Sequence, residues 1–88
     1  MSLSKIAKIL SELDNEQEVH SFLNELFTEG ELSDLSKRWC ILELLKKGYT
    51  QRAISNELNV SLCKITRGAK IIKNKNSVTT RYLDREVK

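Results

Sequence analysis

Proline is absent from the 88 residues of this chain, and glycine occurs only three times. Both residues are poor helix formers, and turn-rich β folds use them often. Apolar residues also recur at intervals of three and four along most of the sequence, which is the spacing of one helical face. The sequence therefore predicts an all-α fold.

Caps and polar breaks divide this pattern into six helices. Thr28 and Glu31 have the spacing of a capping box, in which each side chain binds the backbone N–H of the other residue. Gly48 follows an apolar stripe, as a glycine does at a helix C-terminus, and Thr50 can cap the next helix. Asp14 or Asn15 can cap the second helix. The predicted helices cover about residues 3–13, 14 or 15 to 27, 29–47, 50–58, 61–72 and 77–87.

The length predicts one domain over residues 1–88 with a small core, which a partner subunit often completes. Cys40 and Cys63 lie in apolar helical patterns, so we expect reduced, packed cysteines. With His20 as the only histidine, no metal site or cofactor is predicted from residue clusters. No apolar run approaches the roughly 20 residues of a membrane span, and the first residues lack a signal-peptide core. We therefore expect a cytoplasmic protein with no membrane partner.

Charge is distributed unevenly along the chain. Residues 1–45 hold four basic and nine acidic side chains, a net charge of −5, whereas residues 46–76 hold eight basic side chains and one acid, a net charge of +7. Such a segment attracts polyanions. The simpler alternative is a cationic face that only meets solvent.

Residues 50–68 have the spacing of a helix-turn-helix, a two-helix unit that many proteins use to read DNA. Asn59 stands at the turn position that favours positive φ, a conformation that asparagine tolerates well. Ser55 is small enough for two helices to approach closely, and Ser61 can cap the second helix. The residues expected to face inward and lock the two helices together are Ile54, Leu58, Val60 and Ile65.

The remaining residues of this segment are free to face outward. A helix fits the major groove and offers its N-terminal residues to base edges, while the first helix of the pair crosses the phosphate backbone. A protein-interaction role for the same motif is the alternative. The predicted DNA-binding residues are Gln51, Arg52, Ser61, Leu62, Lys64, Thr66, Arg67, Lys70 and Lys73.

A longer stretch, about residues 25–73, resembles the bacterial tryptophan repressor family. The resemblance is carried by Ile65-Thr66-Arg67-Gly68, by Thr50-Gln51-Arg52, and by Leu26-Phe27-Thr28 ahead of a long helix that contains Arg38. The acidic first helices and residues 83–88 are similar to a less characterised, Trp-repressor-like subgroup. The resemblance implies a six-helix fold, an intertwined homodimer and a transcriptional repressor that binds a near-palindromic operator. It implies no enzyme, and no nucleophile–base pair in the sequence suggests one.

The resemblance also implies L-tryptophan as a corepressor bound beside the recognition helix. Arg38 and Arg67 match the positions that flank the indole ring, and Arg38 can also pair with the ligand carboxylate. Thr28 matches the edge near the ligand amino group, and Gly68 leaves room for the ring. Lys64, Ile71 and Glu29 differ from the residues usual in the family. Another small effector, or an effector-independent DNA-binding protein, is therefore the alternative.

Overall fold

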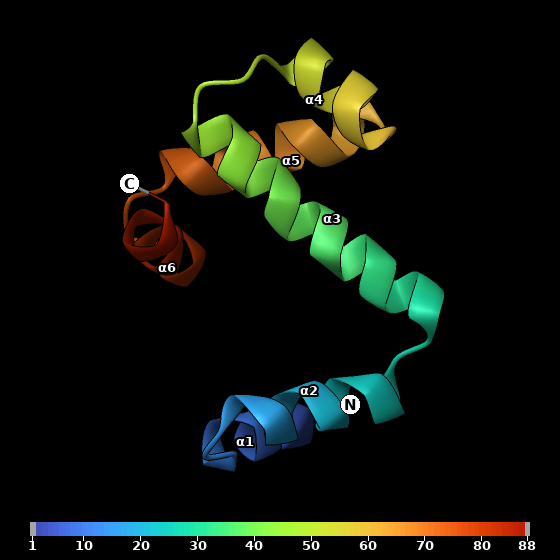
Figure 1. Cartoon of the computed structure of the whole chain (residues 1–88). Coiled ribbons are helices and arrows are strands. Elements are labelled where there is room, and N and C mark those ends of the chain that lie inside the picture. Colours follow the sequence, from blue (N-terminus) through green and yellow to red (C-terminus); the bar gives the residue numbers. More distant parts are fainter. Residues whose placement is uncertain (1, 88) are drawn as a thin grey trace. The chain divides into compact units, whose positions relative to one another are not determined.

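A computed structural model describes residues 2–87 of the chain. Within this range it contains six α-helices and no β-strand, which confirms the all-α prediction (Figure 1). The chain forms two compact units, one ending at Ser33 and the other beginning at Asp34. That residues 1–88 act as one domain stays a prediction. The helices are α1 (Leu3–Glu12), α2 (Glu16–Leu26), α3 (Glu29–Lys46), α4 (Gln51–Leu58), α5 (Leu62–Lys73) and α6 (Val78–Glu86).

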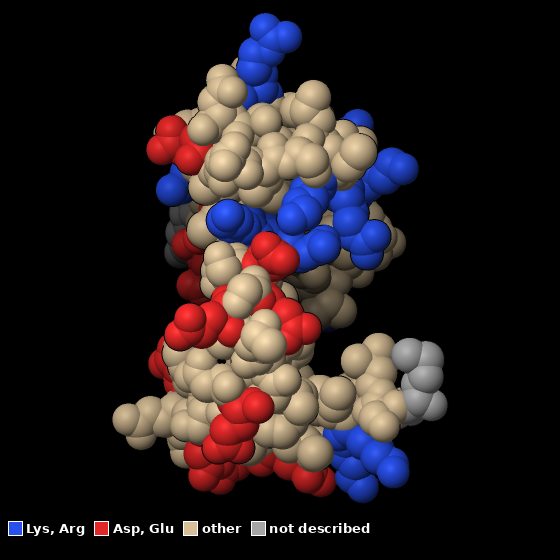
Figure 2. All heavy atoms as spheres, turned by 90° about the vertical axis from the view of Figure 1, so that its right-hand side faces the viewer, with Lys and Arg blue, Asp and Glu red and all other residues tan. Residues whose placement is uncertain are grey.

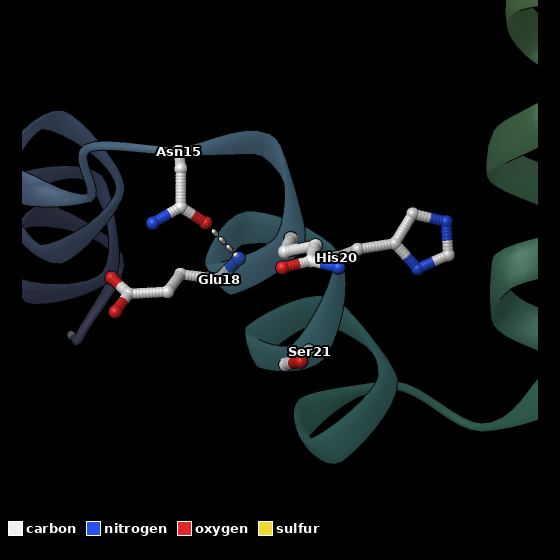
Figure 3. Close-up of a pocket in the computed structure, with 5 residues that line it drawn as sticks. Asn15, Glu18, His20 and Ser21 are labelled. Atoms are coloured by element: carbon white, nitrogen blue, oxygen red, sulfur yellow. Dashed lines mark hydrogen bonds between the residues drawn. The ribbon is translucent and has the colours of Figure 1, made fainter.

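The N-terminal unit begins with two short amphipathic helices. The Asn15 side chain caps α2, because its Oδ1 accepts the backbone N–H of Glu18 at 2.8 Å (Figure 3). Glu16 and Glu18 then lie at the positive end of the helix dipole, where acids are favoured. A hollow beside this cap is lined by Asn15, Gln17, Glu18, His20 and Ser21, none of which is a predicted site residue. Neither α1 nor α2 contains a buried residue.

Both ends of α3 use the caps that the sequence predicts. The Thr28 N–H donates to Glu31 Oε1 at 2.9 Å, and the Glu31 N–H donates to Thr28 Oγ1 at 3.2 Å, so the capping box is confirmed. At the other end Gly48 adopts a φ of +95°. Its N–H donates to the Leu45 carbonyl and the Tyr49 N–H donates to the Leu44 carbonyl, each at 3.0 Å, which satisfies two otherwise free carbonyls.

Residues 50–68 form a helix-turn-helix. Thr50 Oγ1 caps α4 by accepting the Ala53 N–H, and Ser61 Oγ caps α5 by accepting the Lys64 N–H. Asn59 ends α4 in the left-handed conformation, at φ 54° and ψ 51°. The Ser55 hydroxyl adds a contact that the sequence did not predict, because it donates to the Val60 carbonyl at 2.9 Å. Local capping and one left-handed residue therefore fix this motif.

The helix-turn-helix is held to α3 by a small apolar core. Ile54 and Ile65 have no exposed surface, and Ile41 of α3 is 1% exposed. These three residues form one cluster, against which four half-buried side chains pack: Leu44, Leu45, Leu58 and Val60. All four residues that were expected to lock the motif thus face inward.

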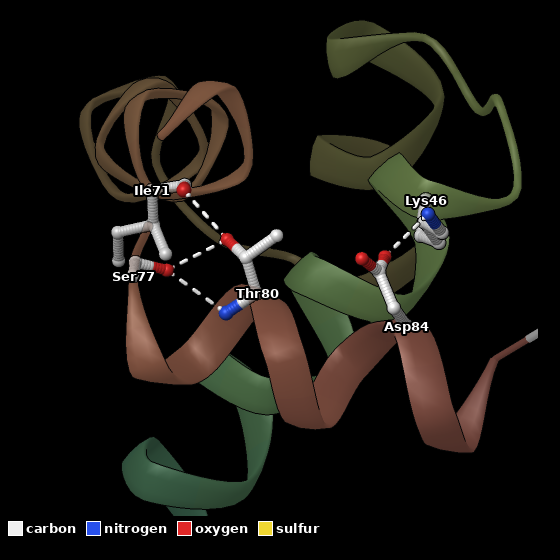
Figure 4. Close-up of polar contacts among 5 residues, drawn as sticks. All are labelled: Lys46, Ile71, Ser77, Thr80 and Asp84. Carbon is white, nitrogen blue, oxygen red and sulfur yellow. Dashed lines mark hydrogen bonds and ion pairs between the residues drawn. The ribbon is translucent and has the colours of Figure 1, made fainter. Parts of the chain in front are cut away.

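A second cluster attaches α6. Leu42 of α3 packs with Leu83 and Val87, and Trp39 lies half-buried beside them. Thr80 is buried, and its hydroxyl donates to the Ile71 carbonyl at 2.9 Å while accepting the Ser77 hydroxyl at 2.7 Å (Figure 4). An exposed ion pair between Lys46 and Asp84, at 2.6 Å, joins α3 to α6 but adds little stability at the surface.

The prediction that Cys63 is packed in the interior is wrong. This cysteine is exposed, whereas Cys40 is half-buried. Cys63 comes two positions before Ile65, a step of about 200° around a helix, so the burial of Ile65 turns Cys63 to the opposite side. Across residues 2–87, no helix is long and apolar enough to cross a membrane, and no group of His, Cys, Asp and Glu could hold a metal ion.

Candidate nucleic-acid interface and ligand hollow

The outer face of α5 carries most of the predicted DNA-binding residues. Ile65 and Gly68 are buried on the inner face, and Lys64 is half-buried between the two faces. Leu62, in the first turn, is 56% exposed. Gln51 and Arg52 are exposed in the first turn of α4. The other predicted residues are also exposed: Ser61, Thr66, Arg67, Lys70 and Lys73.

The basic side chains of this unit are available to an anion. Figure 2 shows lysine and arginine side chains gathered on the drawn face of the C-terminal unit. The salt bridges found within residues 2–87 join Lys46 to Asp84 and Arg85 to Glu86, so none neutralises a predicted DNA-binding residue. The backbone N–H groups at the N-terminus of α5 add positive potential beside these side chains.

Thr66 is more restricted than the sequence suggests. Its hydroxyl donates to the Leu62 carbonyl at 2.9 Å, so the hydroxyl proton is already used within the helix. The oxygen remains free to accept a hydrogen bond. Phosphate oxygens only accept hydrogen bonds, whereas adenine and cytosine present amino groups in the major groove. Thr66 therefore suits a base contact better than a phosphate contact.

Three of the four predicted effector-binding residues line one hollow in the C-terminal unit. Arg38 comes from α3, and Arg67 and Gly68 come from α5; the hollow has a volume of about 220 Å³. Leu42 and Ile71 complete its wall. Thr28 belongs to the N-terminal unit, and its part in this site stays a prediction.

The residues around the hollow provide two kinds of contact. Arg38 and Arg67 are exposed guanidinium groups, and no acidic residue is among the five that line the hollow. A guanidinium forms charge-assisted hydrogen bonds with a carboxylate and stacks on an aromatic face. Leu42 and Ile71 add an apolar surface. Sequence reasoning missed Leu42, although its position four residues after Arg38 places both on one face of a helix.

Gly68 has a structural role in helix packing that does not depend on a ligand. A Cβ atom at this position would lie 3.1 Å from Ile41 Cγ2 and 3.4 Å from both Leu42 Cδ2 and Leu45 Cδ1. The first distance is shorter than ordinary van der Waals contact. The missing side chain thus lets α5 lie directly against α3, which brings Arg67 and Arg38 to the same hollow.

Comparisons with known proteins agree with the residue patterns. A family model described as Trp repressor protein matches residues 1–87. The chain is 36% identical over 72 residues to a Trp operon repressor homolog of Xylella fastidiosa, covering 81% of this chain and 78% of the relative. A homolog of Chlamydia trachomatis is 31% identical over 80 residues, or 85% of each chain. A Vibrio campbellii homolog is 43% identical over 68 residues, covering 76% of this chain and 67% of the relative. No solved structure matches the chain significantly.

Proposed function

The chain belongs to the Trp repressor family of DNA-binding transcriptional repressors, and on this premise we propose that α5 reads operator DNA under the control of a small effector. One observation gives the strongest support to the proposal that α5 reads DNA. The inner face of α5 is fixed by fully buried Ile65, while its outer face presents exposed basic residues that no acid neutralises among residues 2–87. A transcription regulator of this family is not an enzyme.

The helix-turn-helix geometry supports a specific arrangement of α4 and α5 on the duplex. The N-terminal half of α5 enters the major groove, where Lys64 and Arg67 reach guanine or phosphate and Thr66 accepts from a base amino group. Gln51 and Arg52 at the start of α4 contact phosphates. The exposed Leu62 side chain suits a thymine methyl group.

We expect duplex binding to weaken steeply with salt. Each phosphate contact releases condensed counterions, so log K should fall against log salt concentration with a slope of about −0.9 per contact. Fluorescence anisotropy of a labelled operator across a salt series measures this slope, with a scrambled duplex as the control for sequence preference. Binding that does not change with salt would favour the alternative, in which the motif contacts another protein.

A homodimer would complete the apolar core of this small chain. Large apolar side chains are exposed at several positions, and a partner subunit would cover them. A twofold dimer places two copies of α5 on one side of the duplex, so the operator would be near-palindromic. These exposed residues include Leu3, Ile9, Leu26, Leu35, Val78 and Tyr82.

The hollow between α3 and α5 is the proposed effector site. Its two guanidinium groups and apolar wall suit a ligand with a carboxylate and a flat apolar body, and L-tryptophan is the candidate that the family indicates. Because Arg67 belongs both to the hollow and to the DNA-facing side of α5, a bound ligand would fix a residue of the reading surface. This contact is how an effector would change operator affinity.

Replacing Arg38 by alanine should weaken effector binding by about 10- to 100-fold, because a hydrogen bond to a charged group contributes ~1.5–3 kcal/mol. Effector-free duplex binding should stay unchanged, since Arg38 lies on α3 and outside the helix-turn-helix. Isothermal titration calorimetry with L-tryptophan measures the first effect. Arg81→Ala, which removes an exposed arginine of α6 outside the hollow, is the matched control. If the wild-type chain gives no heat with L-tryptophan, tryptophan is not the effector, and the proposal that α5 binds DNA is unaffected.

A further inference from the structure

We propose that Lys47 and Tyr49, which precede the helix-turn-helix, extend the DNA contact along the phosphate backbone beside α4. The proposal rests on the function proposed above for α4 and α5. It adds two residues to the DNA-binding residues that the sequence predicts, and it assigns both to the backbone rather than to the bases.

The segment that joins α3 to α4 is exposed and basic. Every residue from 46 to 53 is exposed, and the stretch contains Lys46, Lys47 and Arg52 but no acid. Tyr49 is its one aromatic residue and is 49% exposed. Figure 1 shows this segment leading into α4, whose first turn carries the proposed phosphate contacts. A cationic surface that continues from this turn suits further phosphates of the same backbone.

Tyr49 is held in place by caps on both sides. Gly48 ends the α3 segment at a φ of +95°, and the Tyr49 N–H donates to the Leu44 carbonyl at 3.0 Å. Thr50, the next residue, caps α4 by accepting the Ala53 N–H at 3.1 Å. The backbone of Tyr49 is therefore set before DNA binds, so a contact made by its side chain needs little additional ordering of the chain.

The Tyr49 side chain combines an apolar ring with a hydroxyl donor. Tyrosine is among the residues that bind phosphate and sugar oxygens in protein–DNA complexes. The side-chain hydrogen bonds found between residues 46 and 53 are made by Lys46 and Thr50, and none uses the Tyr49 hydroxyl. Its proton is thus available to a phosphate oxygen, unlike that of Thr66, which is already donated to the Leu62 carbonyl.

Lys46 and Lys47 differ in how their charges are engaged. Lys46 Nζ is paired with Asp84 Oδ1 of α6 at 2.6 Å (Figure 4). Lys47 takes part in neither of the salt bridges found within residues 2–87. A lysine on a phosphate releases condensed counterions and so makes binding more dependent on salt, whereas a neutral tyrosine hydroxyl does not. The contacts of Lys47 and Tyr49 can therefore be told apart in a salt series.

The test is fluorescence anisotropy of labelled duplexes with wild type, Tyr49→Phe and Lys47→Gln. The probes are an operator that the wild-type chain selects from a random duplex pool and a scrambled duplex of equal length. Tyr49→Phe removes one hydrogen bond to a charged group, so it should weaken binding to both duplexes by about tenfold and leave the salt slope unchanged. Lys47→Gln should make the slope less steep by about 0.9. Tyr82→Phe is the matched control, because Tyr82 is 50% exposed on α6 and its replacement should change neither quantity.

A second measurement distinguishes a direct contact from support of the fold. Single phosphates of the operator are replaced in turn by uncharged methylphosphonate. At the phosphate that Tyr49 binds, this replacement should weaken wild type more than Tyr49→Phe, since the variant has already lost that contact. A tyrosine that only supports the fold would give equal losses at every position, and Tyr49→Phe would then lower the midpoint of urea denaturation.

The outcomes separate this proposal from the proposed function. If wild type binds neither duplex, both fall together. If wild type binds and both variants match it in affinity and salt slope, the extension is wrong, the helix-turn-helix still reads DNA, and the exposed segment serves a partner other than DNA. A loss of affinity for the operator alone would overturn the assignment to the backbone, because phosphate contacts carry no sequence information. Each variant decides the part of its own residue.

Discussion

Reversing the charge of Lys64 and Lys70 together should lower operator affinity by about a hundredfold. Each lysine that contacts a base or phosphate contributes ~1–3 kcal/mol, and each 1.4 kcal/mol corresponds to a factor of ten. Lys70 is exposed and Lys64 half-buried, both on α5, so the change acts at the surface that would meet the duplex. Anisotropy of a labelled operator at fixed salt gives the affinity of wild type and of the Lys64→Glu, Lys70→Glu variant.

A second double variant separates local contacts from net charge. Lys5 and Lys8 are exposed on α1, in the N-terminal unit, and their replacement by glutamate changes the net charge by the same amount. Only the α5 variant should lose affinity beyond the small uniform decrease that follows from lower total charge. Equal losses in both variants would mean that the chain attracts DNA through its overall charge, and α5 would have no special role.

The fold was predictable where the deciding interactions are local. Asn15, Thr28, Thr50, Ser61 and Ser77 each cap the helix that follows, and each lies at or next to the helix boundary that the sequence predicts. Capping depends on residues three positions apart, which a single sequence displays directly. The left-handed turn at Asn59 was predictable for the same reason.

Contacts between helices were harder to foresee. The sequence gives no sign that the Thr80 hydroxyl reaches the Ile71 carbonyl, or that a Cβ at Gly68 would meet Ile41, because both depend on how α3, α5 and α6 pack. The exposure of Cys63 follows from the rotation of α5 about its axis, which the apolar residues on both of its sides left ambiguous. The hollow between Arg38 and Arg67 was foreseen only through the family resemblance.

Replacing Ile65 by alanine should destabilise the chain by ~2–5 kcal/mol, the range measured when a large buried aliphatic side chain is cut back to alanine. Ile65 has no exposed surface and packs with Ile41 and Ile54, so the change leaves a cavity at the junction of α3, α4 and α5. Domains of ordinary stability unfold at a cost of only ~5–15 kcal/mol, so the loss is a large part of the total. Urea denaturation followed by circular dichroism, at matched protein concentration, measures it.

Leu62→Ala on the same helix is the informative comparison. Leu62 is 56% exposed, so its replacement should change stability by no more than about 0.5 kcal/mol while weakening operator binding. The two variants then divide α5 into a face that maintains the fold and a face that contacts DNA. Equal denaturation midpoints for both would show that Ile65 does not anchor the helix. The outer face of α5 would then have no fixed orientation, and the reading of DNA by that face would lose its physical basis.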